Sequence, residues 1–154
     1  MEAIEFRPIG RVVGGRHEII DDRWGDVVAE IVLEPWLPDG ALEGLNAFSH
    51  LEVVTFLDRA SEPTGDQGRR RPRGLADLPE IGILAQRHKD RPGRLGLSRC
   101  SVVSVAERSI EVKGLDAVDG TPVVDLKPWF DAFGPLGAVR EPAWVSRVVE
   151  DYWS

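Results

Sequence analysis

The distribution of turn-forming residues is the feature that most restricts the fold. The chain has 16 glycines and 11 prolines among 154 residues, and they are spread along its whole length. The short runs between them are apolar and rich in β-branched residues, as in buried strands. We expect strands at 9–13, 26–33, 50–58, 81–87, 100–106 and 110–113. Six or more short strands separated by turns predict a mainly β fold, either a barrel or a sandwich.

Two helical segments are predicted outside the strands. Apolar residues fall on one helical face near the C-terminus, which predicts a helix over 142–153 with Pro142 in its first turn. The residues of this face are Trp144, Val145, Val148, Val149 and Tyr152. A short helical turn is expected at 41–45. The segments 59–80 and 91–99 are expected to be loops, and long loops in small domains are usually functional or mobile.

Composition limits the class of protein. The length of 154 residues suits one domain, with a core at about 6–130. The net charge of −7 argues against a protein that coats nucleic acid non-specifically, since phosphate contacts need many cations. Cys100 is the single cysteine, so no disulfide forms within the chain. The N-terminal residues show no signal-peptide pattern and no apolar run suits a membrane span, so we expect a cytoplasmic protein.

Common catalytic motifs are missing from the sequence. His17, His50 and His88 lie far apart, and no ligand pair has metal-binding spacing, so we expect no metal. Ser49 and His50 are neighbours on a predicted strand and point to opposite faces, which disfavours a Ser–His dyad. The sequence has neither a nucleophile elbow nor a glycine-rich phosphate loop.

Two polar segments remain as candidates. Residues 82–99 carry Arg87, Arg91, Arg94 and Arg99, and residues 114–130 carry three aspartates around a Gly-Thr-Pro turn. One interpretation is a solvated basic loop and a decorated hairpin corner. The other is a pair of binding loops, in which arginines and carboxylates of complementary charge surround one small ligand.

Four segments, in order, resemble the TsaA/YaeB (TrmO-like) domain family. They are PIGRVV at 8–13, GLNAFSHLEVVTF at 44–56, GILAQRHKDRPGRLGLS at 82–98 and GLDAVDGTPVVDLKPW at 114–129. The last is nearly identical to the family motif. The third departs from it at His88 and at Gly93-Arg94, where the family usually has Ser and Asn-Pro.

The resemblance implies a fold, a cofactor and an activity. The fold is a small closed or partly open β-barrel with flanking loops and a short C-terminal helix. The activity is S-adenosylmethionine-dependent methyl transfer to N6 of threonylcarbamoyladenosine in tRNA, or to a related RNA or small molecule, by a homodimer. The alternative is a non-catalytic module that binds S-adenosylmethionine or a nucleoside. The implied cofactor-binding residues are Arg16, His17, His50, Leu51, Arg87, Leu97, Asp116, Asp119, Gly120, Thr121 and Pro122.

Side-chain chemistry agrees with that ligand. Asp116 or Asp119 can accept hydrogen bonds from the ammonium or the ribose hydroxyls, and Arg87 can bind the carboxylate through two donors. Asp125 and His50 are candidates for the base that removes the N6 proton. The alternatives are that Asp125 pairs with Lys127 and that His50 is a core histidine bonded to backbone.

Contacts with RNA would need cations around the site. The candidates are Arg69, Arg70, Arg71, Arg91, Arg94 and Lys127. The alternative for such charge runs is a solvated loop. Trp129 or Phe130 would stack a flipped base, or else pack beneath the C-terminal helix.

Overall fold

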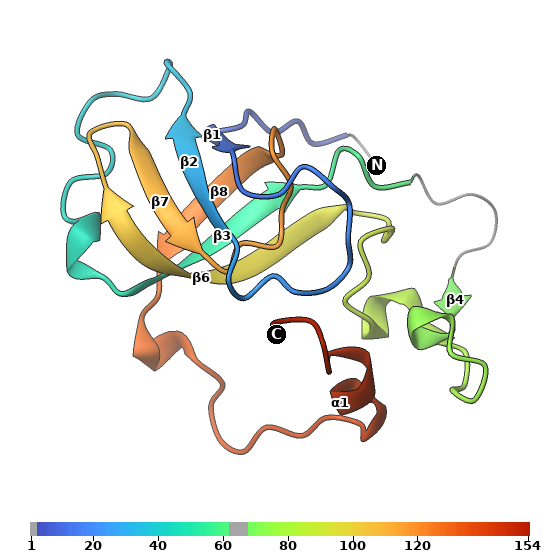
Figure 1. Cartoon of the computed structure of the whole chain (residues 1–154). Helices are drawn as coiled ribbons and strands as arrows, with labels where there is room; N and C mark the ends of the chain where they lie inside the picture. Colours follow the sequence, from blue (N-terminus) through green and yellow to red (C-terminus); the bar gives the residue numbers. More distant parts are fainter. Residues whose placement is uncertain (1–2, 62–67) are drawn as a thin grey trace.

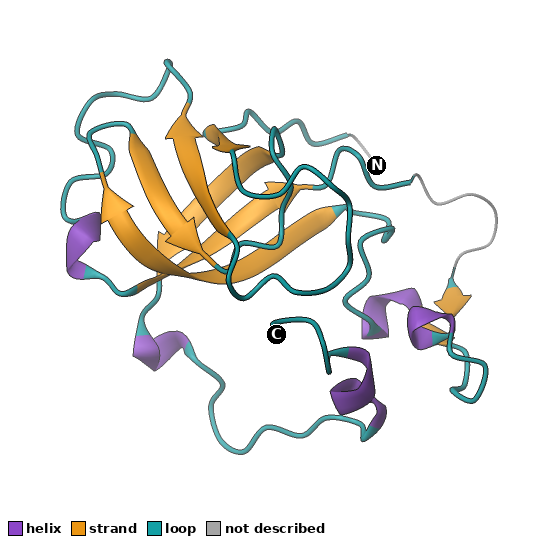
Figure 2. Cartoon of the chain, in the orientation of Figure 1, coloured by secondary structure: helices purple, strands orange, loops and turns teal. Residues whose placement is uncertain are grey.

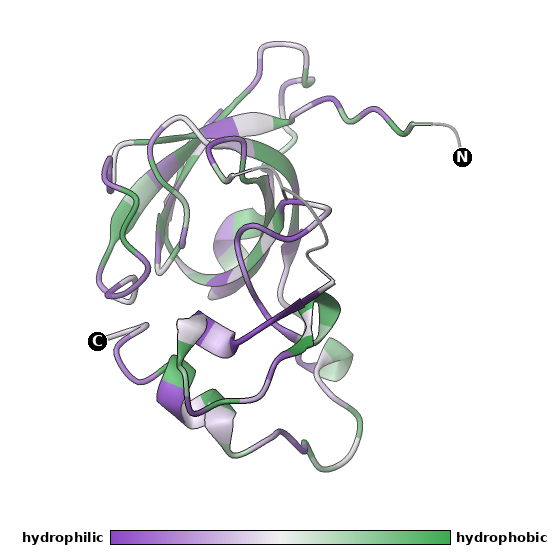
Figure 3. Ribbon diagram, turned by 90° about the vertical axis from the view of Figure 1, so that its right-hand side faces the viewer, coloured by the Kyte–Doolittle hydropathy of each residue, from purple (hydrophilic) through white to green (hydrophobic). Residues whose placement is uncertain are grey.

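The barrel is built from six antiparallel strands. The computed structural model describes residues 3–61 and 68–154. The strands close in the order β1-β2-β7-β6-β3-β8 (Figure 1). They are β1 (Gly10–Val13), β2 (Val28–Leu33), β3 (His50–Phe56), β6 (Leu95–Val105), β7 (Ser109–Lys113) and β8 (Pro122–Pro128). Figure 3 looks into the ring that they form, and the prediction of a small β-barrel is confirmed.

Alternate residues of each strand fill the interior. Val12, Ile31, Leu51, Ile110 and Val123 have no exposed surface, while their neighbours along the strands face outward. This is the period of two that a strand imposes on its side chains. A barrel of this size is filled by side chains, so the ligand site is to be sought at its ends or on its outer wall.

Closure of the barrel depends on one close backbone approach. β1 pairs with β2 along its whole length and with β8 at Gly10↔Val123. A Cβ atom at Gly10 would lie 2.6 Å from the Val32 carbonyl oxygen, so no larger residue fits there without a backbone shift. Gly10 therefore lets one short strand join both neighbours.

Two predicted boundaries along the arginine-rich segment are wrong. The predicted strand 81–87 is limited to β5 (Ile81–Gly82) and is followed by the 3-10 helix η3 (Ile83–Ala85), where the Gln86 amide donates to the Ile83 carbonyl at 3.3 Å. The predicted loop 91–99 becomes strand from Leu95 onward. There Leu95 and Leu97 alternate with small residues, and the segment pairs with β3.

An annex, formed by residues 68–91 and 142–154, lies beside the barrel. Short helices sit at the periphery, and the long strands gather in the barrel (Figure 2). Besides β5 and η3, the annex holds β4 (Arg69–Arg70), η2 (Pro72–Gly74) and α1 (Trp144–Val148). Part of the predicted 59–80 loop, residues 62–67, lies outside the described residues. In the described parts of the chain, no helix has the length and apolar character needed to cross a membrane.

The two helical predictions also need correction. The helix predicted over 142–153 is present only as α1, and beyond it the carbonyls of residues 151–153 accept from the amides of Arg23, Trp24 and Gly25. The short turn predicted at 41–45 is present as hydrogen-bonded turns, in which the Leu45 amide donates to the Leu42 carbonyl at 3.1 Å, and η1 (Leu45–Ala47) follows. Gly44 with φ of 84° precedes η1 and sets its start, since this left-handed conformation suits glycine. A further 3-10 helix, η4 (Asp131–Phe133), follows β8.

Candidate functional site

The β7–β8 loop, residues 114–121, closes one end of the barrel. Its apolar residues Leu115, Ala117 and Val118 are buried and plug the interior. Asp116 and Asp119 alternate with them and are only partly buried. The plug therefore holds two carboxylates at the barrel end, close to the surrounding loops.

The carboxylate of Asp119 is tied to the loop that follows β1. The Gly14 amide donates to Asp119 Oδ1 at 2.7 Å, and His17 Nδ1 lies 3.4 Å from Oδ2. The Asp119 amide donates in turn to the Arg16 carbonyl at 2.8 Å. The structure thus brings together three predicted site residues from opposite ends of the sequence. The Asp119 side chain keeps 35% of its surface exposed and so can still accept from a ligand.

Asp116 lies deeper and is held by two hydroxyl groups. Ser98 Oγ donates to its Oδ1, and Tyr152 Oη donates to its Oδ2. Burial raises the pKa of Asp116, while the Tyr152 hydrogen bond and the positive charge of Arg87 oppose the rise. Arg87 is tied to the same place, because it donates to the carbonyl of Leu97, whose neighbour in the chain, Ser98, donates to Asp116. Asp116 and Arg87 belong to one site, together with the Asp119 loop.

Arg87 is placed by the adjoining strand. Its Nη2 donates to the Leu97 carbonyl at 3.0 Å. Leu97 itself projects outward from β6, with 42% of its surface exposed. The predicted pair Arg87 and Leu97 is thus in direct contact. We call the assembly of Arg16, His17, Arg87, Ser98, Asp116, Asp119 and Tyr152 the barrel-end cluster.

Several predicted binding residues make hydrogen bonds or stacking contacts within the chain and so shape the barrel-end cluster. Arg16 donates to the Asp22 carbonyl at 2.7 Å and to the Arg23 carbonyl, and its guanidinium stacks on Trp24 at 4.2 Å. Thr121 is buried and donates through Oγ1 to the Val118 carbonyl at 2.7 Å. Gly120, with φ of 83°, and Pro122 complete the turn into β8. These residues fix the backbone on which the acidic groups sit.

Two other predicted cofactor contacts lie elsewhere. The side chain of Leu51 is completely buried in the barrel core. His50 is exposed on the outer wall, where its ring contacts Ser49 Oγ at 2.8 Å and Ser101 Oγ at 3.4 Å. The structure of one chain does not bring His50 or Leu51 to the barrel-end cluster. The alternative of a core histidine is wrong as well, because the ring is exposed.

Asp125 is on the same outer wall as His50. Its Oδ2 accepts from Lys127 Nζ at 2.6 Å, and its Oδ1 accepts from the Leu126 amide at 2.9 Å. Pairing with Lys127 was one of the two interpretations of Asp125. Its role as a base stays a prediction, and so does a role of Lys127 toward RNA.

The predicted RNA-contacting arginines make internal contacts. Arg69, Arg71 and Arg91 donate to the carbonyls of Glu80, Leu78 and Gln86. Arg70 lies 3.6 Å from Asp90 Oδ2 and contacts the His88 ring. Arg94 stacks on Phe56 at 4.8 Å. These contacts order the loops, and any contact of the guanidinium groups with RNA stays a prediction.

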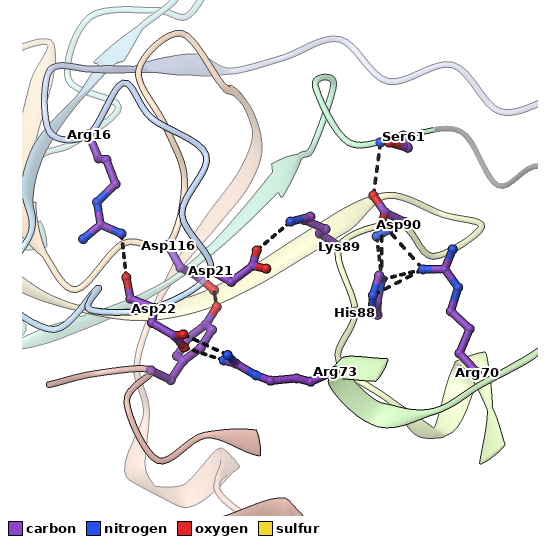
Figure 4. Close-up of polar contacts among 11 residues, drawn as sticks. Arg16, Asp21, Asp22, Ser61, Arg70, Arg73, His88, Lys89, Asp90 and Asp116 are labelled. Atoms are coloured by element: carbon purple, nitrogen blue, oxygen red, sulfur yellow. Dashed lines mark hydrogen bonds and ion pairs between the residues drawn. The ribbon is translucent and has the colours of Figure 1, made fainter. Parts of the chain in front are cut away.

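Ion pairs join the annex to the loop after β1, beside the barrel-end cluster. Arg73 binds both carboxylate oxygens of Asp22, and Lys89 donates to Asp21 at 2.6 Å (Figure 4). The Arg73 hydrogen bond lowers the pKa of Asp22. Burial, together with the charge of Arg70, lowers the pKa of His88. The annex is thus held to the loop after β1 by paired charges rather than by a continuous apolar core.

Sequence reasoning missed Ser98 and Tyr152. The apolar pattern assigned Tyr152, the only tyrosine of the chain, to the buried face of a predicted helix. Its hydroxyl could have indicated a polar partner, since the hydroxyl of a buried tyrosine is usually hydrogen-bonded. Ser98 closes the family motif at 82–98, but nothing in that spacing indicates its partner.

Two hollows lie away from the barrel-end cluster. One, of about 470 Å³, is lined by residues 39–46 and 105–107. The other, of about 430 Å³, lies beside Trp129, Phe130 and Phe133. There Arg99 stacks on Trp129 at 4.3 Å, and Phe130 stacks on Phe48 and Phe133. Among residues 3–61 and 68–154, no group of three acidic, histidine or cysteine side chains is arranged to hold a metal.

The fold and the barrel-end cluster define a class: small antiparallel β-barrels with a polar site built from loops at one end. A solved structure titled as TrmO has this fold, with a TM-score of 0.74 and 24% identity over 91% of this chain and 64% of that one. The sequence profile of the tRNA-methyltransferase O N-terminal domain matches residues 22–134. The chain belongs to this family.

Relatives from curated proteins agree with the family. A protein of Archaeoglobus fulgidus named "S-adenosyl-L-methionine-binding protein" is 33% identical over 107 residues, covering 70% of this chain and 73% of that protein. A second protein of that organism, named "Probable S-adenosyl-L-methionine-binding protein", is 36% identical over 77% of this chain. The Escherichia coli "tRNA (adenine(37)-N6)-methyltransferase" is 35% identical over 64% of this chain. The chain spans only 31% and 43% of these last two proteins.

Proposed function

We propose that this chain binds S-adenosylmethionine at the barrel-end cluster and transfers its methyl group to N6 of threonylcarbamoyladenosine in tRNA. The observation that carries the proposal is that the loop 114–121 holds Asp116 and Asp119 at one end of the barrel, where Asp116 is bound by Ser98 and the adjacent Leu97 carbonyl is bound by Arg87. Membership of the family and the names of the relatives support both the cofactor and the reaction.

The residues present fit the chemistry of the cofactor. Asp119 has one oxygen bound to the Gly14 amide and a partly exposed side chain, so it can accept from an ammonium or from ribose hydroxyls. Arg87 has donors beyond the one bound to Leu97 and can hold a carboxylate.

The main contribution of the chain to the reaction is to position the two reactants. Bound S-adenosylmethionine supplies a methyl group already activated by its sulfonium. The chain holds the two reactants in line, which is worth about 7–11 kcal/mol in well-oriented cases. Asp125 and His50 remain the proposed proton acceptors, and both face outward from the barrel wall.

A homodimer, which the family resemblance implies, is part of the proposal. The outer face of β6 exposes Leu95 and Leu97, close to the outward-facing Asp125. A second copy on this wall would cover these apolar residues and bring ligand contacts to it. We also infer a cytoplasmic location, since the proposed tRNA substrate is found there.

A binding module without transfer is the second candidate. It is favoured by the A. fulgidus relative that matches most of its own length and is named only for binding S-adenosylmethionine. The internal pairing of the predicted RNA-contacting arginines also fits this candidate, because it leaves fewer cations for phosphate.

Calorimetry followed by a transfer assay separates the candidates. We expect wild-type protein to bind S-adenosylmethionine and Asp119→Asn to bind it about tenfold more weakly, since hydrogen bonds to charged groups contribute about 1.5–3 kcal/mol. Asp39→Asn is the matched control, because Asp39 lies on the far hollow with 84% of its side chain exposed. Labelled methyl transfer to tRNA containing threonylcarbamoyladenosine supports the enzyme. Binding without transfer supports the module, and no binding by the wild type overturns both.

A further inference from the structure

The C-terminal segment adds a group to the barrel-end cluster from beyond the family domain. The family match ends at residue 134, whereas Tyr152 lies near the end of the chain. Its hydroxyl nevertheless reaches the carboxylate of Asp116, in the most specific family motif. The names of the relatives do not indicate a role for this contact.

The segment is docked by its backbone and not by a single side chain. The amides of Arg23, Trp24 and Gly25 donate to the carbonyls of residues 151, 152 and 153 at 3.0, 2.9 and 3.1 Å. Gly25 allows this approach, since a Cβ atom there would lie 2.1 Å from the Trp153 carbonyl oxygen. Figure 1 shows the C-terminus returning to the barrel from α1. The Tyr152 ring packs edge-on against Trp153 at 4.9 Å between centroids.

The Tyr152 hydroxyl is the second of two hydroxyl groups that donate to the Asp116 carboxylate. Asp116 accepts from Ser98 on one oxygen and from Tyr152 on the other, which leaves both oxygens bonded in the ionised form. A buried carboxylate without such donors takes up a proton instead of keeping its charge. Tyr152 therefore favours the charged and oriented state of Asp116.

We propose that Tyr152 is a positioning residue of the ligand site, which holds Asp116 ionised and fixed in orientation so that it can accept hydrogen bonds from the bound ligand. This inference rests on the proposed S-adenosylmethionine site. It assigns the C-terminal segment a direct part in binding, acting through Asp116.

The charged and polar groups around Asp116 determine the direction in which its pKa changes when the Tyr152 hydroxyl is removed. The groups that interact with Asp116 are Arg87, after η3, Tyr152, near the C-terminus, and Cys100, in β6. Asp21 and Arg87 also act on the Tyr152 hydroxyl. The Tyr152 hydrogen bond lowers the Asp116 pKa, so its removal raises that pKa. Ligand affinity that needs the carboxylate is present above this pKa and is lost as the pH falls through it.

Tyr152→Phe removes only the hydroxyl and keeps the ring. We expect a carboxyl NMR titration of the ligand-free full chain to show the Asp116 pKa raised by about one unit. We expect the dissociation constant for S-adenosylmethionine to rise about tenfold at neutral pH, and its acid-side loss of affinity to begin about one pH unit higher.

Gly25→Ala is the second variant, because it displaces the segment without touching Tyr152. It should raise the Asp116 pKa to the same extent, and the double variant should show no further rise, since both changes remove one interaction. An unchanged Asp116 pKa in Tyr152→Phe overturns the inference. An unchanged pH profile of binding also overturns it, even where the protein is less stable. Absence of binding by the wild type overturns the proposed function, while the ligand-free titration still decides whether Tyr152 controls Asp116.

Discussion

Inside the barrel, Ile31, Ile110 and Val112 have no exposed surface and pack in one apolar cluster. The annex, residues 68–91 and 142–154, buries few apolar residues, among them Leu78 and Ile83. It is joined to the barrel side by ion pairs and by three backbone hydrogen bonds. Stability is therefore concentrated in the barrel. The barrel-end cluster lies where the two regions meet, with Asp116 from one and Tyr152 from the other.

The largest expected effect comes from the barrel core. Ile110→Ala leaves a cavity in a fully buried position and should lower the free energy of unfolding by about 2–5 kcal/mol. Val103→Ala is the matched control on the neighbouring strand, with 51% of its side chain exposed, and should change it by less than about 0.5 kcal/mol. Urea unfolding measures both. Similar losses for the two variants would contradict the assignment of inward and outward faces.

The difference between the regions also explains what the sequence could predict. The barrel follows from alternation of apolar residues, which a period of two makes visible in β2, β3 and the β6–β7 hairpin. The acidic loop and Arg87 were candidates from their charges and turn residues, and the family motif supported them. In the annex, local patterns were overridden by tertiary contacts, so the strand at 81–87 and the long C-terminal helix were predicted wrongly.

The missed parts of the site depend on tertiary contacts. Tyr152 reaches Asp116 only because the chain leaves α1 after Val148 and pairs by its backbone with residues 23–25. Apolar periodicity cannot indicate that this segment bonds to a distant loop. The outward direction of His50 follows from the strand period once Leu51 is known to be buried. The sequence alone does not decide which of two neighbours faces inward.

Loss of the docked C-terminal segment is the intermediate effect. Gly25→Ala should lower the free energy of unfolding by about 1–3 kcal/mol, since a backbone carbonyl must move and three hydrogen bonds are disturbed. Hydrogen exchange should speed up at the amides of Arg23 and Trp24 and remain slow at β3. The matched control is Gly93→Ala, because a Cβ atom there meets nothing within 4 Å. Equal exchange changes across the barrel would show that annex and barrel open as one unit.

The ion pair Asp22–Arg73 should give the smallest effect. Its side chains keep 28% and 34% of their surface exposed, and a double-mutant cycle with Asp22→Asn and Arg73→Gln should yield about 0.2–1 kcal/mol of coupling. Arg73 lowers the Asp22 pKa below its usual value of 3.8. The stabilisation is then complete above that value and is lost as the pH falls through the lower, folded-state pKa. Unfolding at neutral and acidic pH, at low and high salt, measures it. A coupling as large as the Ile110→Ala effect would mean that charge pairs, and not the apolar barrel, hold the annex and core together.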